Sequence, residues 1–261
     1  MSLRVLTRGV VLLGDSYVEG WYVSDDETTA ARLGARRRQP KAIVWFLFEG
    51  HDLYDDQNFE NALTAGPPPE ADTRPHAEGL TRDHGWDRRS FVLNAFERIR
   101  RWSAPLVPNR PPPYRALLPQ PGGRGQPIDF FDYAAVPWRP YEEERWAIAR
   151  KAFEAGTAVA REHGIEVVFV YIPIKFRVFR DVIQIPEGSP MARWNVWRLL
   201  PLRFQDFCAS AGVPCVDLTD RFRQAVGEGR LPYPPNDTHW SPDGHAIAAD
   251  ALYELLRARG W

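Results

Sequence analysis

The segment Gly9-Val-Val-Leu-Leu-Gly14, followed directly by Asp15-Ser16, decides the fold expected for this chain. A continuous apolar run closed by glycine is typical of a strand buried on both faces of a parallel sheet. Three further segments have the same character, at 42–48, 165–172 and 213–218. Helical patterns separate the four segments, at about 26–37, 88–102, 141–163, 191–211 and 242–259. This alternation of strands and helices predicts a three-layer α/β/α domain around a parallel sheet.

Residues 60–140 interrupt that alternation with clusters of proline, among them 67–69 and 111–113. Proline has no amide proton to donate, so such sequence cannot continue a central strand. We therefore expect a proline-rich insertion at about 60–140 over the top of the sheet, within a single domain spanning 1–261. Two interpretations of the insertion remain open, a substrate-covering cap and a surface excursion without a role.

Composition limits which binding partners and which cellular location can be expected for this chain. The chain has 261 residues and a formal net charge of -1, which gives no reason to expect nucleic acid as a partner. No apolar run approaches the roughly 18 residues of a membrane span, and 9–13 is too short for a signal peptide. As written, the sequence predicts a cytoplasmic protein; a start upstream of Met1 would allow a periplasmic or extracellular one. We interpret Cys208 and Cys215 as two buried thiols, and the oligomeric state stays open.

Ser16 follows a predicted strand, so its hydroxyl is expected at the carboxyl end of the sheet, where open α/β sheets bind their ligands. A serine hydroxyl is a weak nucleophile until a base removes its proton. Asp237-Thr-His239 supplies such a base, because residues i and i+2 of an extended loop project to the same side. Asp237 can then accept the Nδ1 proton of His239 and leave Nε2 to take the proton of Ser16. The alternatives are an ordinary turn at Ser16 and a hydrogen-bonded loop at 237–239.

Four segments together resemble the SGNH (GDSL-type) hydrolase family. They are Gly14-Asp15-Ser16-Tyr-Val-Glu-Gly20, Phe48-Glu-Gly50-His51-Asp52-Leu53, Tyr171-Ile-Pro-Ile-Lys175-Phe-Arg-Val178 and Asp237-Thr-His239-Trp240. The last has the Asp-x-His-Trp form of proteins related to the alginate O-acetyltransferases. The resemblance implies a flavodoxin-like SGNH architecture and an ester hydrolase or O-acyltransferase that works through an acyl-serine intermediate. It also implies an O-acetylated carbohydrate or similar small ester as substrate, and no cofactor.

The resemblance assigns roles to individual positions of this chain. The implied catalytic residues are Ser16 as nucleophile, His239 as general base and Asp237 as the group that orients the histidine. The implied oxyanion-hole residues are Ser16, Gly50 and His51. The implied substrate-binding residues are Asp15, Lys175 and Trp240.

Two departures from the family pattern keep a second function open. His51 stands where the family has asparagine, and only eight residues separate Leu33 from Ala42, which leaves no room for the usual second strand. We therefore expect that strand to be missing or altered. The departures motivate the hypothesis of an impaired relative that binds acyl or glycan ligands without turnover. A metal site built from Asp237, His239 and His245 is a third hypothesis, but it leaves the strand-end serine without a role, and we expect no metal.

Overall fold

The computed structural model describes residues 2–5, 10–14, 41–50, 52–53, 114–120, 123, 125–131, 140–194 and 199–260. All of these residues belong to one compact unit formed by 1–58 and 113–261. Residues 59–112 lie outside the described part of the chain, and so do the helices expected at 26–37 and 88–102.

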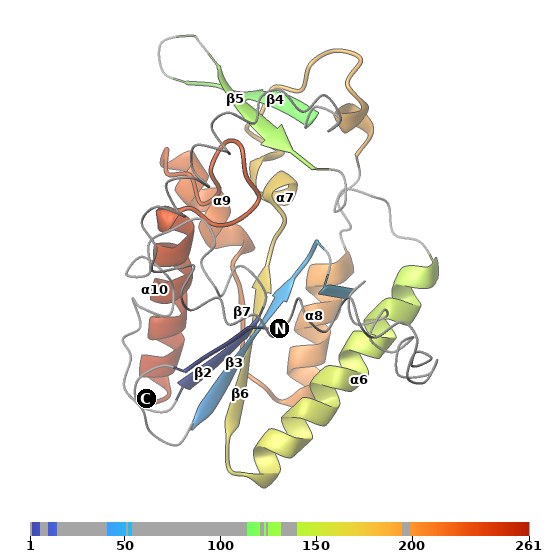
Figure 1. Ribbon diagram of the computed structural model, residues 1–261, viewed down its shortest axis with the longest axis vertical. Helices are drawn as coiled ribbons and strands as arrows, with labels where there is room; N and C mark the ends of the chain where they lie inside the picture. The colour runs from blue at the N-terminus through green and yellow to red at the C-terminus, as the bar shows by residue number, and fades with distance from the viewer. Residues whose placement is uncertain are drawn as a thin grey trace, which may run out of the picture. The chain divides into compact units, whose positions relative to one another are not determined.

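A five-stranded sheet forms the centre of the described unit (Figure 1). Its strands, in spatial order, are β1 (Ser2–Val5), β2 (Val10–Gly14), β3 (Ala42–Phe48), β6 (Glu166–Ile172) and β7 (Cys215–Asp217). The last four run parallel, and β1 pairs antiparallel with β2. The four apolar segments of the sequence are these four parallel strands, which confirms the expected α/β fold.

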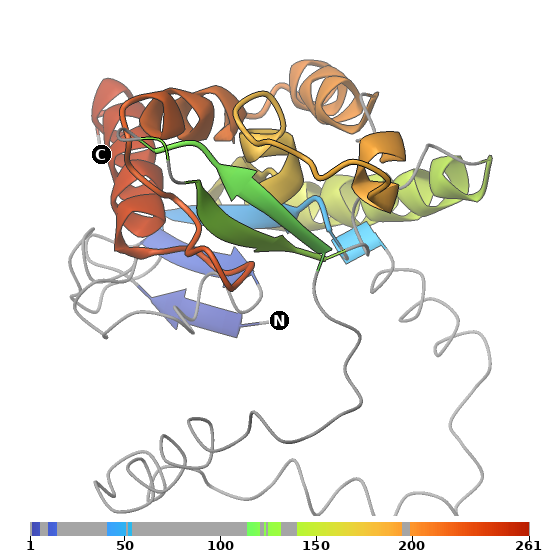
Figure 2. The same cartoon turned by 90° about the horizontal axis from the view of Figure 1, so that it is seen from above.

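Helices cover both faces of the sheet. On one face lie α9 (Thr219–Gly227) and α10 (Pro242–Ala258), and on the other lie α6 (Pro140–Glu162) and α8 (Leu199–Ala211) (Figures 1 and 2). Strand β6 shows why both faces need cover. Val168 and Val170 pack in the core under α9 and α10, whereas Phe169 and Tyr171 pack in the core under α6 and α8. Because side chains alternate between faces, an unbroken apolar strand requires a helical layer on each side.

The edge of the sheet beside β2 departs from a regular parallel arrangement. The strand on that edge is β1, which precedes β2 in the chain and runs against it, with Ser2 opposite Gly14 and Val5 opposite Val11. On its other edge β2 pairs directly with β3, with Val10 opposite Ala42. We expected the parallel second strand of the SGNH family, which lies beside the first, to be missing or altered. Among the described strands, β1 lies on that side of β2, and it runs antiparallel. Residues 15–40, which connect β2 to β3, are not among those described.

A β-hairpin and a short helix extend from the carboxyl end of the sheet (Figure 1). The hairpin consists of β4 (Tyr114–Leu118) and β5 (Gln126–Phe130), a separate two-stranded sheet that falls within the range expected as an insertion. Two backbone hydrogen bonds, of 2.9 and 2.7 Å, join Leu117 of β4 to Gln184. Helix α7 (Lys175–Phe179) follows β6, and its residues are all buried.

Two expectations need correction. The helix expected over 191–211 is divided into a 3₁₀ turn, η7 (Pro190–Arg193), and α8, because 194 is extended; residues 195–198 lie outside the described part. Cys208 and Cys215, interpreted above as two thiols, form a disulfide that ties α8 to β7. The fold brings their Cα atoms to 6.1 Å, within the range that a disulfide spans.

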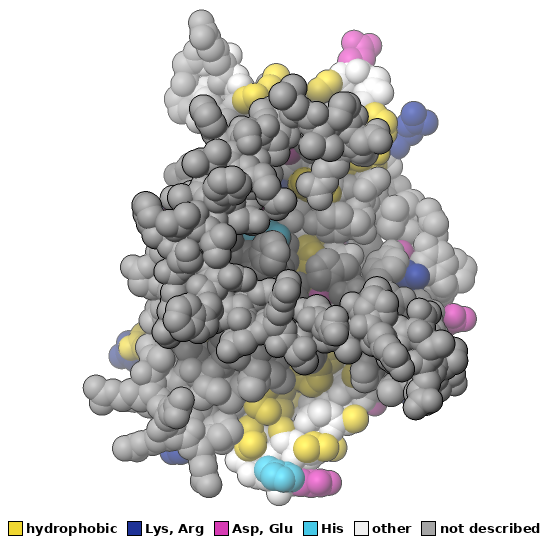
Figure 3. All heavy atoms as spheres, in the orientation of Figure 1, with side chains coloured by type: hydrophobic (Ala, Val, Ile, Leu, Met, Phe, Trp, Pro, Cys, Tyr) yellow, Lys and Arg dark blue, Asp and Glu magenta, His cyan; other side chains and the backbone are white. Residues whose placement is uncertain are grey.

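The surface of the described unit is mixed in character. Figure 3 shows hydrophobic side chains gathered at the lower end of one face, where α6 ends and β6 begins. Val159 of α6 is 58% exposed. Exposed apolar side chains are common on folded proteins. Within the described residues, no helix combines the length and the apolar character that crossing a membrane requires.

Candidate active site

The loop between α9 and α10 carries a paired aspartate and histidine. Asp237 Oδ1 lies 2.6 Å from His239 Nδ1 and also accepts the backbone amide of His239 at 2.8 Å. The same carboxylate oxygen therefore fixes both the backbone and the ring of His239. With a carboxylate as its partner, Nδ1 carries the ring proton, so the lone pair of the neutral imidazole resides on Nε2. This is the tautomer that a general base needs.

The electrostatics of the pair suit that role. Burial acts to raise the pKa of Asp237, but the hydrogen bonds from the His239 ring and from the amides of His239 and Thr238 outweigh burial and lower the pKa. The carboxylate is therefore ionised at neutral pH. The side chains of His239 and Asp237 are 23% and 30% exposed, so a ligand can reach the pair.

Residues 240–244 fix the end of this loop. The Ser241 hydroxyl accepts the amide of Gly244 at 3.2 Å and so caps α10, while the Ser241 amide donates to the carbonyl of Pro232 at 2.9 Å. A Cβ atom at Gly244 would lie 2.3 Å from that same carbonyl oxygen, so only glycine permits the close approach. Trp240 is 1% exposed and packs edge-on against Phe46 of β3. The loop is thereby joined both to its helix and to the core.

Lys175, the first residue of α7, lies beneath the same loop. Its ammonium group donates to the carbonyl oxygens of Pro234, Pro235 and Asp237 at 2.6, 2.9 and 3.1 Å. The residue is 4% exposed, and its Nζ lies 5.5 Å from the centre of the Phe130 ring. Burial lowers the pKa of Lys175 to about 7, and the charges of Asp129 and Asp237 oppose this decrease. All three protons of the ammonium thus bind backbone oxygens of the loop.

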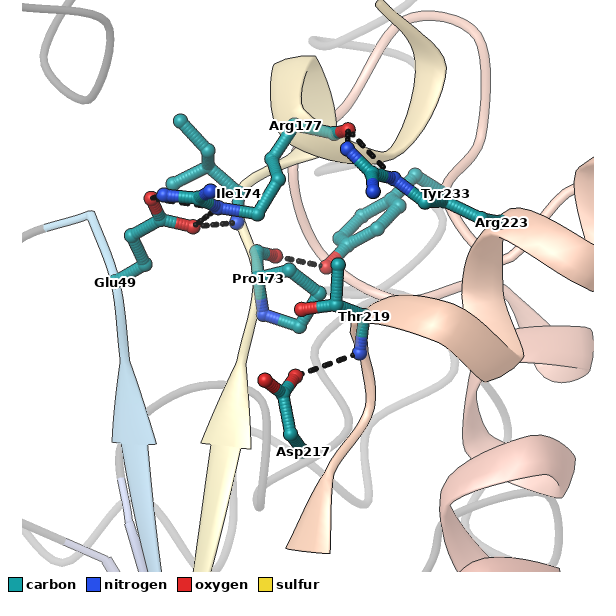
Figure 4. A network of polar contacts seen from close by, with 8 residues as sticks. All are labelled: Glu49, Pro173, Ile174, Arg177, Asp217, Thr219, Arg223 and Tyr233. Atoms are coloured by element: carbon teal, nitrogen blue, oxygen red, sulfur yellow. Dashed lines mark hydrogen bonds and ion pairs between the residues drawn. The ribbon is translucent and has the colours of Figure 1, made fainter. Parts of the chain in front are cut away.

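A buried ion pair fixes the start of α7 (Figure 4). Arg177 Nε lies 2.9 and 2.7 Å from the two carboxylate oxygens of Glu49, which directly follows β3, and Arg177 Nη2 donates to the same carboxylate. Glu49 also accepts the amide of Ile174 at 2.9 Å. On the other side of α7, Arg223 of α9 donates to the carbonyl of Arg177 at 3.2 Å, and the Tyr233 hydroxyl donates to the carbonyl of Pro173. The segment 173–177 is therefore held from two directions.

Residues 49–50 form a turn at the end of β3. Asp52 accepts the amide of Phe48 at 2.7 Å. A Cβ atom at Gly50 would lie 2.3 Å from the Phe48 ring, which explains the glycine at this position. Gly50 is buried, whereas His51 is outside the described residues.

A small pocket lies against this turn and the 237–239 loop. Its lining is mainly aromatic and consists of Phe48, Phe130, Phe131, Ile174, Lys175, Phe176 and Thr238. The pocket thus joins the end of β3, the hairpin, the start of α7 and the residue between Asp237 and His239. Apart from Lys175 and Thr238, the side chains that line it are apolar.

The structure brings some of the expected site residues together. Asp237, His239 and Lys175 lie together, near the turn that contains Gly50. Trp240 packs in the core and offers almost no surface to a ligand, which replaces the expected substrate-binding role with a packing role. Of the three residues of the metal hypothesis, His245 is 1% exposed and packs against Trp240, and no group of metal-binding side chains occurs among the described residues. Asp15, Ser16 and His51 lie outside the described part of the chain.

Three residues of this region were not expected from the sequence. Glu49 and Arg177 lay within the segments quoted for the resemblance, but without a role of their own. Asp129 of the hairpin donates its amide to the carbonyl of Pro235 at 2.7 Å, and its carboxylate binds Arg115. The signal that could have found Glu49 is a charged side chain directly after a fully apolar strand.

Part of this geometry lies in residues that match a known protein family. Residues 138–261 match the family described as SGNH hydrolase-like domain, acetyltransferase AlgX. This part of the chain is similar to the SGNH hydrolase-like domain of that family. The match includes β6, α7, the Asp237–His239 loop and α10, and it supports a protein of the acetyltransferase and hydrolase class. No curated protein and no solved structure gave a match.

Proposed function

We propose that this protein is a serine-dependent ester hydrolase or O-acyltransferase that acts on O-acetylated carbohydrate or a similar small ester. Ser16 is the proposed nucleophile, His239 the general base and Asp237 the group that orients and stabilises the imidazole. The observation that carries the proposal is the 2.6 Å contact between Asp237 Oδ1 and His239 Nδ1, in a loop of the part of the chain that is similar to an SGNH hydrolase-like domain.

In the proposed first step, the Oγ atom of Ser16 attacks the carbonyl carbon of the ester while its proton passes to His239 Nε2. The resulting tetrahedral intermediate expels the alcohol, which takes that proton from His239, and an acyl-serine remains. In the second step, water or a sugar hydroxyl attacks the acyl group, and His239 again accepts and returns a proton. The two activities differ only in which hydroxyl resolves the acyl-serine.

The oxyanion of the tetrahedral intermediate needs hydrogen-bond donors. We propose the amides of Ser16 and Gly50 and the side chain of His51 for this role. The imidazole N–H of His51 can replace the side-chain amide of asparagine as a donor. The turn at 49–50 supports the assignment of Gly50, because Asp52 accepts the amide of Phe48 just before the turn and the Phe48 ring leaves no room for a side chain at position 50.

A fluorophosphonate probe tests the proposal directly, because it reacts only with a serine that a base has activated. We expect the parent protein to be labelled at Ser16, as mapped by peptide mass spectrometry, and to hydrolyse 4-nitrophenyl acetate. Ser16→Ala should abolish both signals. His239→Ala should lower the labelling rate and the turnover to a similar extent, because the two residues act as a unit.

The same experiment separates the proposed enzyme from an impaired, ligand-binding relative. A folded protein that binds an acetylated oligosaccharide in calorimetry, yet is neither labelled nor active, would be such a relative. Labelling at another serine would remove Ser16 from the mechanism. The substitution His51→Asn then tests the departure from the family, because activity above the parent would identify His51 as a defect.

A further inference from the structure

Lys175 uses all three of its hydrogen-bond donors within the protein. This argues against the substrate-binding role that the resemblance implied. A lysine ammonium has three N–H donors and no acceptor. Each donor of Lys175 binds a backbone carbonyl, those of Pro234, Pro235 and Asp237. With 4% of its surface exposed, the side chain has no donor left for a substrate oxygen. Its effect on the reaction must therefore pass through the loop that it binds.

That loop contains the proposed catalytic dyad. Asp237 supplies both a carbonyl oxygen to Lys175 and a carboxylate to His239, so one residue connects the ammonium to the imidazole. The other two carbonyls belong to Pro234 and Pro235, and proline has no amide proton with which to pair with a neighbouring strand. The 234–237 segment thus depends on groups outside itself. We propose that Lys175 is a positioning residue, which holds the 234–237 loop through three carbonyl oxygens and so places Asp237 and His239 for proton transfer.

The proposal rests on the proposed function, and it adds a residue that acts through the dyad rather than on the substrate. A second contact supports it, since the amide of Asp129 in β5 donates to the carbonyl of Pro235 at 2.7 Å. Lys175 itself is held by its helix, which the Glu49–Arg177 pair fixes to the end of β3. A chain of short polar contacts therefore runs from the central sheet through α7 to the loop. A displacement of about 1 Å in a catalytic group can lower a rate by about 10²-fold.

The protonation state of Lys175 gives the proposal a distinctive pH dependence. Burial lowers the pKa of Lys175 from 10.5 to about 7, against the opposing charges of Asp129 on β5 and Asp237 on the loop. Above that pH the neutral amine donates only two hydrogen bonds, so one carbonyl of the loop loses its hydrogen bond from Lys175 and activity should fall. The stability contribution of this group has the opposite sign. Between about pH 7 and 10.5 the unfolded chain binds more protons than the folded protein, so the contribution of Lys175 to the free energy of unfolding increases with pH.

The test compares Lys175→Met with the parent and with Lys151→Met, a matched control at an exposed lysine of α6. Methionine keeps the length of the side chain and removes the donors. We expect Lys175→Met to lower kcat for 4-nitrophenyl acetate by about 10²-fold, with KM within about threefold, because the substrate site itself is unchanged. Lys151→Met should match the parent. The alkaline decrease of activity in the parent should be absent from Lys175→Met.

Two further measurements keep the proposal falsifiable. In a His239→Ala background, Lys175→Met should cause no additional loss, because the lysine acts only through the dyad. In protein labelled with ¹⁵N-histidine, the downfield Nδ1 proton of His239 should shift or broaden in Lys175→Met and stay unchanged in Lys151→Met. An active parent whose Lys175→Met variant keeps both its turnover and this resonance would overturn the positioning role. An inactive, unlabelled parent whose Nδ1 resonance still responds to Lys175→Met would instead overturn the proposed function and retain the positioning role.

Discussion

The buried ion pair between Glu49 and Arg177 is the structural element whose loss can be predicted most sharply. Their side chains are 3% and 9% exposed, and the Glu49 carboxylate accepts from Arg177 Nε, Arg177 Nη2 and the amide of Ile174. Arg177→Met removes the guanidinium donors, keeps the Ile174 amide and leaves a carboxylate in the interior without its counter-charge. A buried charge that loses its partner costs about 3–5 kcal/mol.

A loss of that size is a large part of the total stability of a domain, which is about 5–15 kcal/mol. For a chain of this length it corresponds to a decrease in Tm of roughly 6–20 °C. The second substitution, Glu49→Gln in the Arg177→Met background, removes the uncompensated charge while it keeps a polar group for Ile174. We expect it to restore at least half of the lost free energy, because replacement of both ions is far less costly than removal of one.

Urea unfolding followed by tryptophan fluorescence measures these differences as shifts in the midpoint at constant slope. The matched control is Arg203→Met, which breaks the exposed pair between Arg203 and Glu143 at 2.8 Å. Their side chains are 43% and 41% exposed, and such pairs contribute about 0–1 kcal/mol. If Arg177→Met costs no more than Arg203→Met, the Glu49–Arg177 pair does not stabilise the fold as argued. If the Glu49→Gln combination is as unstable as Arg177→Met alone, the uncompensated charge is not the cause.

Three further predictions concern the dyad, the triad and the disulfide. Asp237→Asn should keep the fold but lower kcat by several orders of magnitude, as measured on 4-nitrophenyl acetate, because an amide favours the wrong tautomer of His239; activity within tenfold of the parent would exclude Asp237 from the mechanism. Ser16→Ala and His239→Ala should each remove nearly all activity, and the double variant should be scarcely worse, whereas multiplying losses in the same assay would argue against one catalytic unit. Replacement of Cys208 and Cys215 by serine should cost about 2–3 kcal/mol in urea unfolding, from the loop entropy of a sequence separation of 7, and an unchanged midpoint would contradict that account.

The sheet and its helical layers could be predicted because burial on both faces leaves a simple mark in the sequence. The strand expected at 42–48 is observed at those residues, and those expected at 165–172 and 213–218 are observed as Glu166–Ile172 and Cys215–Asp217. Helix α10 begins at Pro242 as expected, because Ser241 caps it and proline suits the first turn. These features depend on local propensity and on the burial of a strand on both faces. Both can be recognised in a single sequence, so the features could be predicted from it.

The hairpin and the disulfide could not be predicted in the same way. Pro127 lies inside β5, and proline argues against a central strand; in a two-stranded sheet its missing amide proton can face away from the partner strand. Strand β1 has only four residues, too few for a clear alternation. The disulfide depends on where α8 ends relative to β7, which is a property of the packed structure and not of the spacing between Cys208 and Cys215.

The candidate site could be predicted only in part. Asp237 and His239 could be paired from the sequence because their interaction is local, two residues apart in a loop. The support beneath them is not local, since Lys175 reaches carbonyls 59 to 62 residues away. A usable signal nevertheless existed, because Phe48 and Ile172 are register partners at the ends of β3 and β6, and each is followed within three residues by a charged side chain. Charges placed directly after apolar strands that lie side by side must find partners there or remain in water. From that rule, Glu49 and Lys175 could have been expected to organise the carboxyl end of the sheet, although their own partners, Arg177 and the 234–237 carbonyls, become evident only in the folded chain.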